Sequence, residues 1–265
     1  MMLDVNHVYK TFHPGTINER RALAGVDLHL EEGDFVTVIG GNGAGKSTLL
    51  NAVAGVWPVD GGSIVIGGND ITGLPDYKRA PFIGRVFQDP MMGTAPDMQL
   101  EENLALAYRR GKKLGLRWHI TREEREMYRQ KLRELNLGLE DRLTTKVGLL
   151  SGGQRQAVTL LMASLQKPRL LLLDEHTAAL DPATAAKVLE LSDKIVEENG
   201  LTALMITHNM KDAIAHGNRL IMMFEGRVVV DVSGEDKKKL TVPDLLEMFS
   251  KASGSDEADD KLLLS

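Results

Sequence analysis

Residues 40–48 read GGNGAGKST, and this stretch decides the fold. It matches the phosphate-loop pattern G-x-x-x-x-G-K-[ST], in which glycines let successive backbone N–H groups curl around one phosphate. A helix directly after the loop would add the positive end of its dipole. With glycine at about 7% of residues, a chance match in a chain of this length is on the order of 1%. The stretch therefore predicts nucleotide binding and not an ordinary glycine-rich turn.

The polar residues of this loop have separate expected roles. Lys46 can reach the β and γ phosphates and is therefore a candidate catalytic residue, while the Ser47 hydroxyl can ligate Mg²⁺. The predicted nucleotide ligands in the loop are Gly40, Asn42, Gly43, Ala44, Gly45, Lys46, Ser47 and Thr48. ATP and Mg²⁺ are the expected cofactors.

The residues around the loop predict an α/β fold. Residues 3–9 and 26–40 alternate apolar and polar side chains, which predicts strands leading into the glycines. From Ser47 onward, apolar residues recur at helical spacing, and Gly55 lies near the expected helix end. Further strands are predicted at 63–66, 84–87, 170–173, 202–207 and 219–224. Helical stretches between the later strands, most clearly 183–198, favour a mostly parallel sheet.

The chain changes character after residue 89. Residues 91–149 are charged and rich in helix-forming residues, and Thr121-Arg122-Glu123-Glu124 has the pattern of a helix start. We therefore expect a helical subdomain, inserted over about residues 89–155.

The C-terminal part predicts one short helix followed by a tail. The helix is expected over residues 236–249. Residues 251–265 are rich in serine, glycine and acid and predict a disordered acidic tail, whose charges are better explained as solvated than as a site. The expected domain thus spans residues 1–250.

Residues 170–175 read LLLLDE, four apolar residues followed by two acids. A buried strand can hold an acid rigidly at its C-terminal tip, where open α/β sheets bind their ligands. Asp174 is predicted to hold Mg²⁺, directly or through water, and Glu175 to act as general base on the attacking water. Two solvated turn acids would explain the pattern equally well alone, but the phosphate loop favours the catalytic interpretation.

Composition limits the remaining classes. The 265 residues include no cysteine, which excludes disulfides, thiolate metal sites and cysteine nucleophiles. The formal net charge of −5 argues against non-specific nucleic-acid binding. No run approaches the roughly 18 apolar residues of a membrane-spanning helix, so we expect any membrane role to come through a partner.

Residues 150–156 read LSGGQRQ, which resembles the LSGGQ signature of ABC ATPases. Other stretches follow in the order typical of that family: FQD at 87–89 resembles its Q-loop, ALD at 179–181 its D-loop, and TH at 207–208 its switch histidine. The resemblance covers residues 3 to about 235. It implies a P-loop NTPase core of α/β class, with an antiparallel β subdomain, the inserted helical subdomain and ATPase activity.

The resemblance also implies roles for single residues. Gln88 would sense Mg²⁺ and the water, as metal ligand and catalytic residue, and His208 would act with Glu175 on the water and γ-phosphate. Phe12 would stack on adenine, with Tyr9 as the rival aromatic. In ABC proteins two subunits meet head to tail, with ATP between the phosphate loop of one and the signature of the other. Nucleotide ligands implied on the second subunit are Ser151, Gly152, Gly153, Gln154 and Asp181.

Two departures from the family pattern indicate a subfamily. His176 stands where the family usually has proline, and residues 157–165 read AVTLLMASL where an arginine- and alanine-rich helix is usual. Neither departure removes a catalytic group. The strings DEHTAALDP from Asp174 and THNMKDA from Thr207 are similar to ATPases partnered with permeases and binding proteins for aromatic amino acids.

The resemblance implies an ATP-hydrolysing subunit of an ABC transporter that energises import by ATP-driven dimerisation. Its implied partners are a second ATPase subunit in a homodimer or pseudo-dimer, membrane permease subunits and an extracytoplasmic substrate-binding protein, with no nucleic acid. The implied location is the cytoplasmic face of the membrane. Met91, Met92 and Met98 form either permease contacts, the favoured interpretation, or ordinary core filling. The alternative is a soluble ABC ATPase, such as an iron–sulfur assembly subunit.

Overall fold

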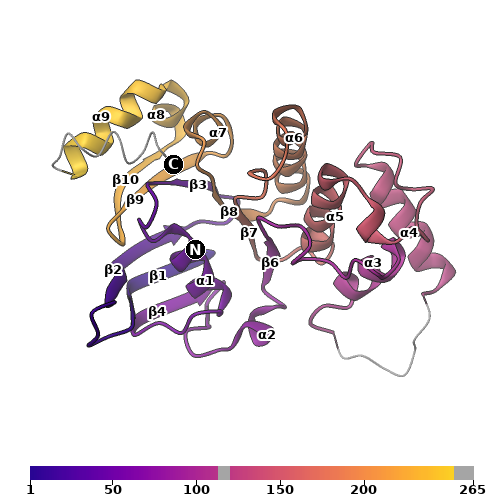
Figure 1. Ribbon diagram of the computed structural model, residues 1–265, viewed down its shortest axis with the longest axis horizontal. Helices are drawn as coiled ribbons and strands as arrows, with labels where there is room; N and C mark the ends of the chain where they lie inside the picture. The colour runs from indigo at the N-terminus through magenta and orange to yellow at the C-terminus, as the bar shows by residue number, and fades with distance from the viewer. Residues whose placement is uncertain (113–119, 254–265) are drawn as a thin grey trace. The chain divides into compact units, whose positions relative to one another are not determined.

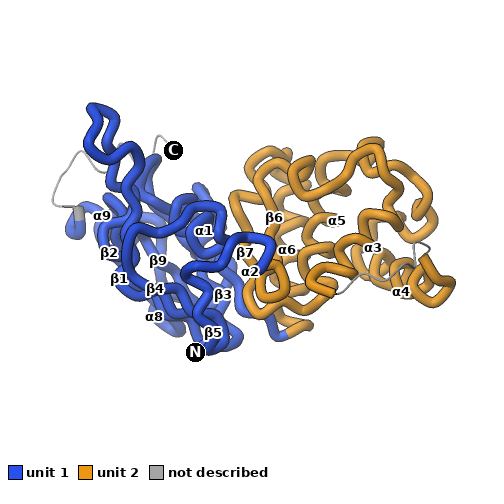
Figure 2. The backbone as a smooth tube through the Cα atoms, turned by 90° about the horizontal axis from the view of Figure 1, so that it is seen from below, with its two compact units in different colours: residues 1–79, 200–265 blue, residues 80–199 orange. Residues whose placement is uncertain are grey.

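The structure is a computed structural model that describes residues 1–112 and 120–253. The chain divides into two compact units (Figure 2). We call residues 1–79 with 200–265 the phosphate-loop unit and residues 80–199 the signature unit, after the motifs that they contain. Each is described by itself below.

The phosphate-loop unit contains an antiparallel sheet and a mostly parallel set of strands (Figure 1). The antiparallel sheet has the order β2-β1-β4-β5, with β1 Leu3–Phe12, β2 Arg20–Leu30, β4 Gly61–Ile66 and β5 Asn69–Asp70. In the second set, β3 lies between β8 and β9 and parallel to both, and β10 pairs antiparallel with β9. These strands are β3 Phe35–Ile39, β8 Thr202–Ile206, β9 Arg219–Phe224 and β10 Arg227–Ser233. The predicted fold class, with its antiparallel β part, is confirmed.

Helices complete this unit. They are α1 Lys46–Ala54, α2 Asp76–Arg79, α7 Met210–Ala215, α8 Gly234–Lys239 and α9 Val242–Ser253. All five residues of β3 are buried, as expected for a central parallel strand. A core containing Ile39, Met222 and Phe249 packs α7 and α9 against β3 and β9. The strand that leads into the phosphate loop is thus packed within a buried apolar core.

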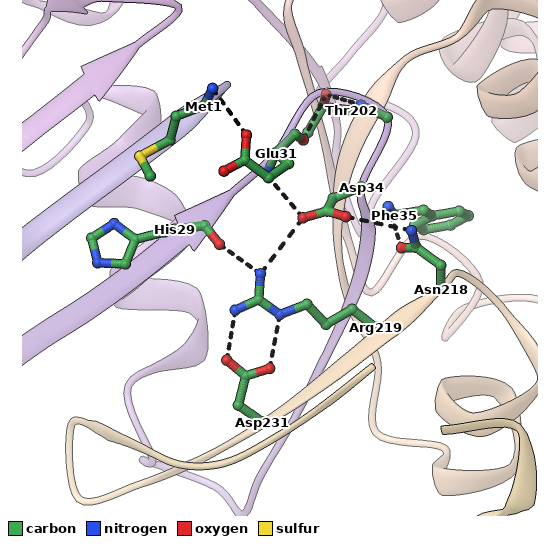
Figure 3. Close-up of polar contacts among 10 residues, drawn as sticks. Met1, His29, Glu31, Asp34, Phe35, Thr202, Asn218, Arg219 and Asp231 are labelled. Carbon is green, nitrogen blue, oxygen red and sulfur yellow. Dashed lines mark hydrogen bonds and ion pairs between the residues drawn. The ribbon is translucent and has the colours of Figure 1, made fainter. Parts of the chain in front are cut away.

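Arg219, the first residue of β9, connects the two sheets of the phosphate-loop unit (Figure 3). Its Nε and Nη2 donate to both carboxylate oxygens of Asp231 on β10, at 2.8 and 2.6 Å. Its Nη1 donates to the carbonyl of His29 on β2, at 2.6 Å, and lies 3.5 Å from the carboxylate of Asp34, just before β3. The bidentate pair with Asp231 has fixed geometry and orients the guanidinium, which then links β10, β2 and the residue before β3.

The signature unit has a small parallel pair of strands and a helical part. Strand β6 (Ile83–Val86) pairs in parallel with β7 (Leu170–Asp174). Its helices are α3 Leu100–Tyr108, α4 Arg122–Arg133, α5 Gly152–Ser164, α6 Pro182–Asn199 and the 3₁₀ turn Val147–Leu149. Leu104, Tyr128 and Val158 belong to one buried core, which joins α3, α4 and α5 (Figure 1). Thr121 caps α4 in a capping box with Glu124, as the sequence predicted.

Three predicted elements differ in extent. The predicted strand 26–40 is the end of β2, a turn closed by Asp34 N–H donating to the Glu31 carbonyl (3.2 Å), and then β3. The predicted single helix 236–249 is instead α8 and α9, because Thr241 and Asp244 cap α9 and Pro243 has no N–H to continue a helix from α8. Helix α9 includes the first three residues of the predicted tail, and the tail from residue 254 onward lies outside the described residues.

Candidate functional site

The phosphate loop joins β3 to α1, as predicted. Gly40 and Gly45 have φ angles of +146° and +105°, which side-chain-bearing residues rarely adopt. A Cβ on Gly40 would lie 2.2 Å from the Met223 carbonyl oxygen, and one on Gly45 would lie 2.5 Å from that of Ala22. Only glycine fits these positions, so the loop backbone is pressed against the sheet and takes the curled form that a phosphate cradle needs.

Lys46 is 5% exposed and folds over its own loop. Its Nζ donates to the carbonyl oxygens of Gly40 at 2.6 Å and Gly41 at 3.2 Å. The cation is therefore already held at the loop, which lowers the reorganisation needed when it faces a phosphate. Ser47, the next residue, is exposed in the first turn of α1.

A cavity of about 260 Å³ opens in front of the loop. It is lined by Phe12, Arg20, Ala22 and every residue from Asn42 to Thr48. Phe12 and Arg20 are direct partners across β1 and β2. Tyr9 is paired with Ala24 instead, and its ring lies over Gly25, where an added Cβ would be 2.8 Å from the Tyr9 hydroxyl. The cavity combines an aromatic face with a phosphate cradle, which fits a nucleoside triphosphate and favours Phe12 over Tyr9.

The sequence did not predict two residues associated with Phe12: Arg20, which lines the cavity, and Trp57, which packs against Phe12. Arg20 Nη2 donates to the Gly43 carbonyl at 3.1 Å, so the guanidinium reaches from the Phe12 strand to the loop. Trp57 packs edge-on against Phe12, with ring centroids 5.5 Å apart. An aromatic residue just after α1 was the only sequence signal for Trp57, and Arg20 had none.

His208 lies at the same edge of the parallel strands as the phosphate loop. Val38 on β3 pairs with Ile206 on β8, and Thr207 N–H donates to the Val38 carbonyl at 3.2 Å. Residues just beyond Ile39 and Ile206 therefore emerge side by side at the carboxyl ends of these strands, where α/β sheets bind ligands. His208 is half-buried in the short connection to α7.

In the signature unit, β7 ends at Asp174, as predicted. The side chain of Asp174 is 16% exposed, and its carboxylate accepts a hydrogen bond from Arg85 Nη2 at 3.0 Å. Burial raises the pKa of Asp174 above its ordinary value, while the hydrogen bond and charge of Arg85 act against that rise. Arg85 also stacks on Phe87, with its guanidinium carbon 4.5 Å from the ring centroid. Arg85 was not predicted, because nothing in its local pattern marks it.

Glu175 follows in an uncommon backbone conformation, with φ of +46°. The chain then turns tightly, because Ala178 N–H donates to the Glu175 carbonyl at 3.0 Å and Leu180 N–H to that of Thr177 at 3.1 Å. Glu175 is half-buried. The predicted general base thus sits at a fixed turn directly after the strand.

The predicted Q-loop and D-loop residues are both exposed. Gln88 follows β6, next to Phe87, whose carbonyl accepts from Gln156 Nε2 of α5 at 3.2 Å. Asp181 caps α6, its Oδ1 accepting from Thr184 N–H at 3.1 Å, and hydrogen bonds from Thr184 lower the pKa of Asp181. This capping role was not predicted.

The signature stretch forms the N-terminus of α5. Ser151 Oγ accepts from Gln154 N–H, and Gln154 Oε1 accepts from Ser151 N–H, both at 3.2 Å, which makes a capping box. Gly153 faces α6, where an added Cβ would lie 2.2 Å from Thr184 Cγ2. Ser151 and Gly152 are exposed at the positive end of the helix dipole, where an anion is favoured.

The predicted residues therefore fall into two sets. Phe12, the phosphate loop and His208 belong to the phosphate-loop unit, and the other candidates belong to the signature unit. Within the described residues, no group of three or more histidine, cysteine or acidic side chains could hold a metal.

Known proteins are similar to this chain in sequence and in fold. Residues 23–178 match the family described as ABC transporter. The chain is 46% identical over 256 residues to the tyrosine transport ATP-binding protein of Clostridioides difficile, covering 95% of this chain and 100% of that protein. It is 34% identical over 234 residues to an aliphatic sulfonates import ATP-binding protein of Pseudomonas fluorescens, covering 88% and 77%. A dimeric post-hydrolysis ATP-binding cassette bound to ADP and Pi aligns with a TM-score of 0.74 at 30% identity, covering 88% and 98%.

The curled loop, the cavity and the acidic strand end define a P-loop ATPase. The chain belongs to the ABC transporter family, with ATP as its nucleotide and transport-coupled ATP hydrolysis as its activity. The predicted family, fold and ATPase function are thus confirmed. No helix among residues 1–112 and 120–253 is long and apolar enough to cross a membrane.

Proposed function

We propose that the chain hydrolyses Mg²⁺-bound ATP as a dimer on the cytoplasmic face of a membrane and energises import of an aromatic amino acid through a permease. The observation that carries the substrate class is the 46% identity along the whole length of a tyrosine transport relative, against 34% for a sulfonate import relative. An extracytoplasmic binding protein would deliver the amino acid.

The phosphate-loop unit binds the nucleotide. Phe12 stacks on adenine at one end of the cavity, and the N–H groups of residues 42–48 hold the phosphates at the other. Lys46 faces the β and γ phosphates and offsets the charge that develops when the bond between them breaks. His208, at the same strand edge, contacts the γ-phosphate and the water.

The signature unit supplies the chemistry. Glu175 takes a proton from the attacking water. Ser47, Gln88 and Asp174 would hold Mg²⁺, which when bound would supply positive charge to offset that of the phosphates. Arg85 favours the ionised form of Asp174 against the effect of burial, which is the form that a cation needs.

The remaining signature-unit residues act on a second subunit. The α5 N-terminus faces the γ-phosphate bound by the partner's loop, through Ser151, Gly152, Gly153 and Gln154, and Asp181 lies in the same interface.

The ATPase domain spans residues 1–250, with the helical subdomain over about 89–155. Within that subdomain, Met91 and Met92 are exposed, as a permease-contact surface requires.

Uptake into proteoliposomes tests the proposal. The chain would be reconstituted in proteoliposomes with the permease encoded beside it. ATP would be supplied on the membrane face that carries the chain, and radiolabelled tyrosine with the binding protein on the opposite face. We expect ATP-dependent tyrosine uptake that Glu175→Gln abolishes. Uptake of methionine or an aliphatic sulfonate in place of tyrosine would refute the substrate class. ATPase activity with no membrane association would favour a soluble ABC ATPase such as an iron–sulfur assembly subunit.

A further inference from the structure

We infer that His176 is a positioning residue for ATP hydrolysis: through a hydrogen bond to Ser192 it fixes the backbone that carries Glu175. The inference rests on the proposed role of Glu175 as general base. It gives a function to the histidine that stands where the family usually has proline.

The hydrogen bond lies wholly inside the signature unit. His176 is 2% exposed and Ser192, on α6, is 0% exposed. His176 Nε2 and Ser192 Oγ are 2.9 Å apart. Ser192 Oγ is also 2.8 Å from the Val188 carbonyl, which can only accept. The single hydroxyl proton of Ser192 therefore goes to Val188, and His176 Nε2 must carry the proton of the other bond.

This geometry makes the histidine a specific link and not a space-filling side chain. A buried imidazole N–H without an acceptor would cost free energy, whereas an apolar side chain of similar size would pack without that requirement. The hydrogen bond to Ser192 thus favours one defined orientation of the His176 ring.

Glu175 is fixed on both sides. Before it, Asp174 ends β7 and pairs with Arg85 at 3.0 Å; after it, His176 is bound to Ser192. Glu175 itself has φ of +46°, in the left-handed region. Non-glycine residues persist there when surrounding contacts over-determine the backbone, and these two contacts do so. Both contacts therefore restrain the backbone from which the Glu175 side chain leaves.

The same hydrogen bond joins Glu175 to the D-loop. Ser192 lies on α6, and the N-terminus of that helix is capped by Asp181. Because one helix holds both ends of the segment 175–181, the base and the D-loop are attached to one rigid element. A helix shift would move them together.

A general base must be placed accurately, since small misplacements of reacting groups lower turnover without affecting ground-state binding. Loss of this one hydrogen bond should lower kcat about 3- to 10-fold. The nucleotide-binding residues of the phosphate-loop unit are untouched, so KM for ATP should change less than about twofold.

Five variants of the full-length chain test this. His176→Leu and Ser192→Ala each remove one side of the bond, and we expect the kcat loss in both, with the double variant no worse than His176→Leu. His176→Gln keeps an N–H donor on a side chain of similar length and should recover most of the turnover. Ser164→Ala is the matched control. Ser164 is also buried, and its hydroxyl contacts only backbone carbonyls within the described part of the chain, those of Leu160 and Leu161, both at 3.0 Å. It should behave as wild type.

A second readout is independent of activity. In ¹⁵N-histidine-labelled protein, His176 should give a slowly exchanging Nε2–H signal with one-bond coupling, identified by its absence in His176→Gln. Ser192→Ala should speed its exchange with solvent, while Ser164→Ala should not.

Several results would overturn the inference. Wild-type kcat in Ser192→Ala would do so, as would equal losses in His176→Gln and His176→Leu. A rise in KM together with a smaller folded fraction by circular dichroism would make the histidine merely structural. Glu175→Gln in the same assay separates failure of the general-base proposal from failure of the His176 inference. If Glu175→Gln keeps turnover, the proposed role of Glu175 fails even where the Nε2–H signal of His176 is present.

Discussion

The phosphate-loop unit and the signature unit hold their functional groups in different ways. In the first, the groups that cradle a phosphate are backbone N–H groups of one run, residues 40–48, and Lys46 rests on carbonyls of that same run. In the second, the strand end proposed for hydrolysis depends on partners far away in sequence: Asp174 pairs with Arg85, and His176, next to Glu175, is hydrogen-bonded to Ser192. Nucleotide binding is encoded locally, whereas the hydrolytic chemistry is held by tertiary contacts.

This difference separates the expected effects of mutation. Changes in the phosphate loop and at Phe12 should mainly weaken ATP binding. Changes in the signature unit should leave binding of the first ATP intact and lower turnover or the stability of the unit. The predictions below test that division.

The largest expected effect is a complete loss that mixing reverses. Lys46→Ala removes the cation that faces the β and γ phosphates, and Ser151→Arg blocks the capped N-terminus of α5 with bulk and misplaced charge. Each variant alone should be inactive, because a symmetric dimer would contain two damaged sites. A mixed dimer should regain one intact site, formed by the phosphate loop of the Ser151→Arg chain and the signature of the Lys46→Ala chain.

Bound ATP per mixed dimer, isolated through two different tags, is the firmest measurement. Hydrolysis is a weaker readout, because the two sites can be coupled. One ATP per mixed dimer supports a site shared between subunits. If Ser151→Arg alone keeps turnover and mixing adds nothing, each chain contains a complete site and the dimer mechanism is refuted.

Glu175→Gln should slow hydrolysis by about 10²- to 10⁴-fold, the range for a lost general base. ATP affinity should remain, because no group of the phosphate cradle changes, and an ATP-bound dimer should accumulate. Single-turnover assays with radiolabelled ATP measure the step directly, and size-exclusion chromatography detects the dimer. Turnover near that of wild type would remove Glu175 from the role of base.

Arg85→Met tests the tertiary support of the chemistry. It leaves the carboxylate of Asp174 buried without its cation, which should destabilise the signature unit by about 3 kcal/mol in urea unfolding. Arg129→Met is the control, because Arg129 forms an exposed ion pair with Glu126 on α4, and such pairs contribute less than about 1 kcal/mol. Equal effects of the two substitutions would show that Arg85 does not support Asp174.

The same division explains what the sequence could predict. The phosphate loop, the LLLLDE strand end and the signature are short contiguous patterns, so their positions followed from local residues. Arg85, Arg20 and Ser192 act through strand register or helix packing, which no local pattern encodes. Their roles required the folded chain.

The boundary errors were of another kind. The break between α8 and α9 has a local signal, the Thr241-Val242-Pro243-Asp244 capping pattern, which outweighs the helical character of its neighbours. The turn before β3 likewise has Gly33 at φ +85° within an alternating stretch. In both places, turn and cap chemistry prevailed over apolar periodicity.

The smallest predicted effect tests whether ATP binding can be changed within the phosphate-loop unit without changing hydrolysis. Phe12 lines the nucleotide cavity, and its partner across the sheet, Arg20, reaches the loop. Phe12→Ala removes one stacking face and should weaken ATP binding by about 1 kcal/mol, roughly fivefold in Kd. Tyr9→Ala is the matched control, because Tyr9 is an aromatic residue of the same strand whose ring lies over Gly25. Titration with a fluorescent ATP analogue should rank Phe12→Ala as the weaker binder, with single-turnover hydrolysis at saturation unchanged in both. The opposite ranking would assign adenine stacking to Tyr9, and a fall in the saturated rate of Phe12→Ala would show that binding and chemistry are not separable between the two units.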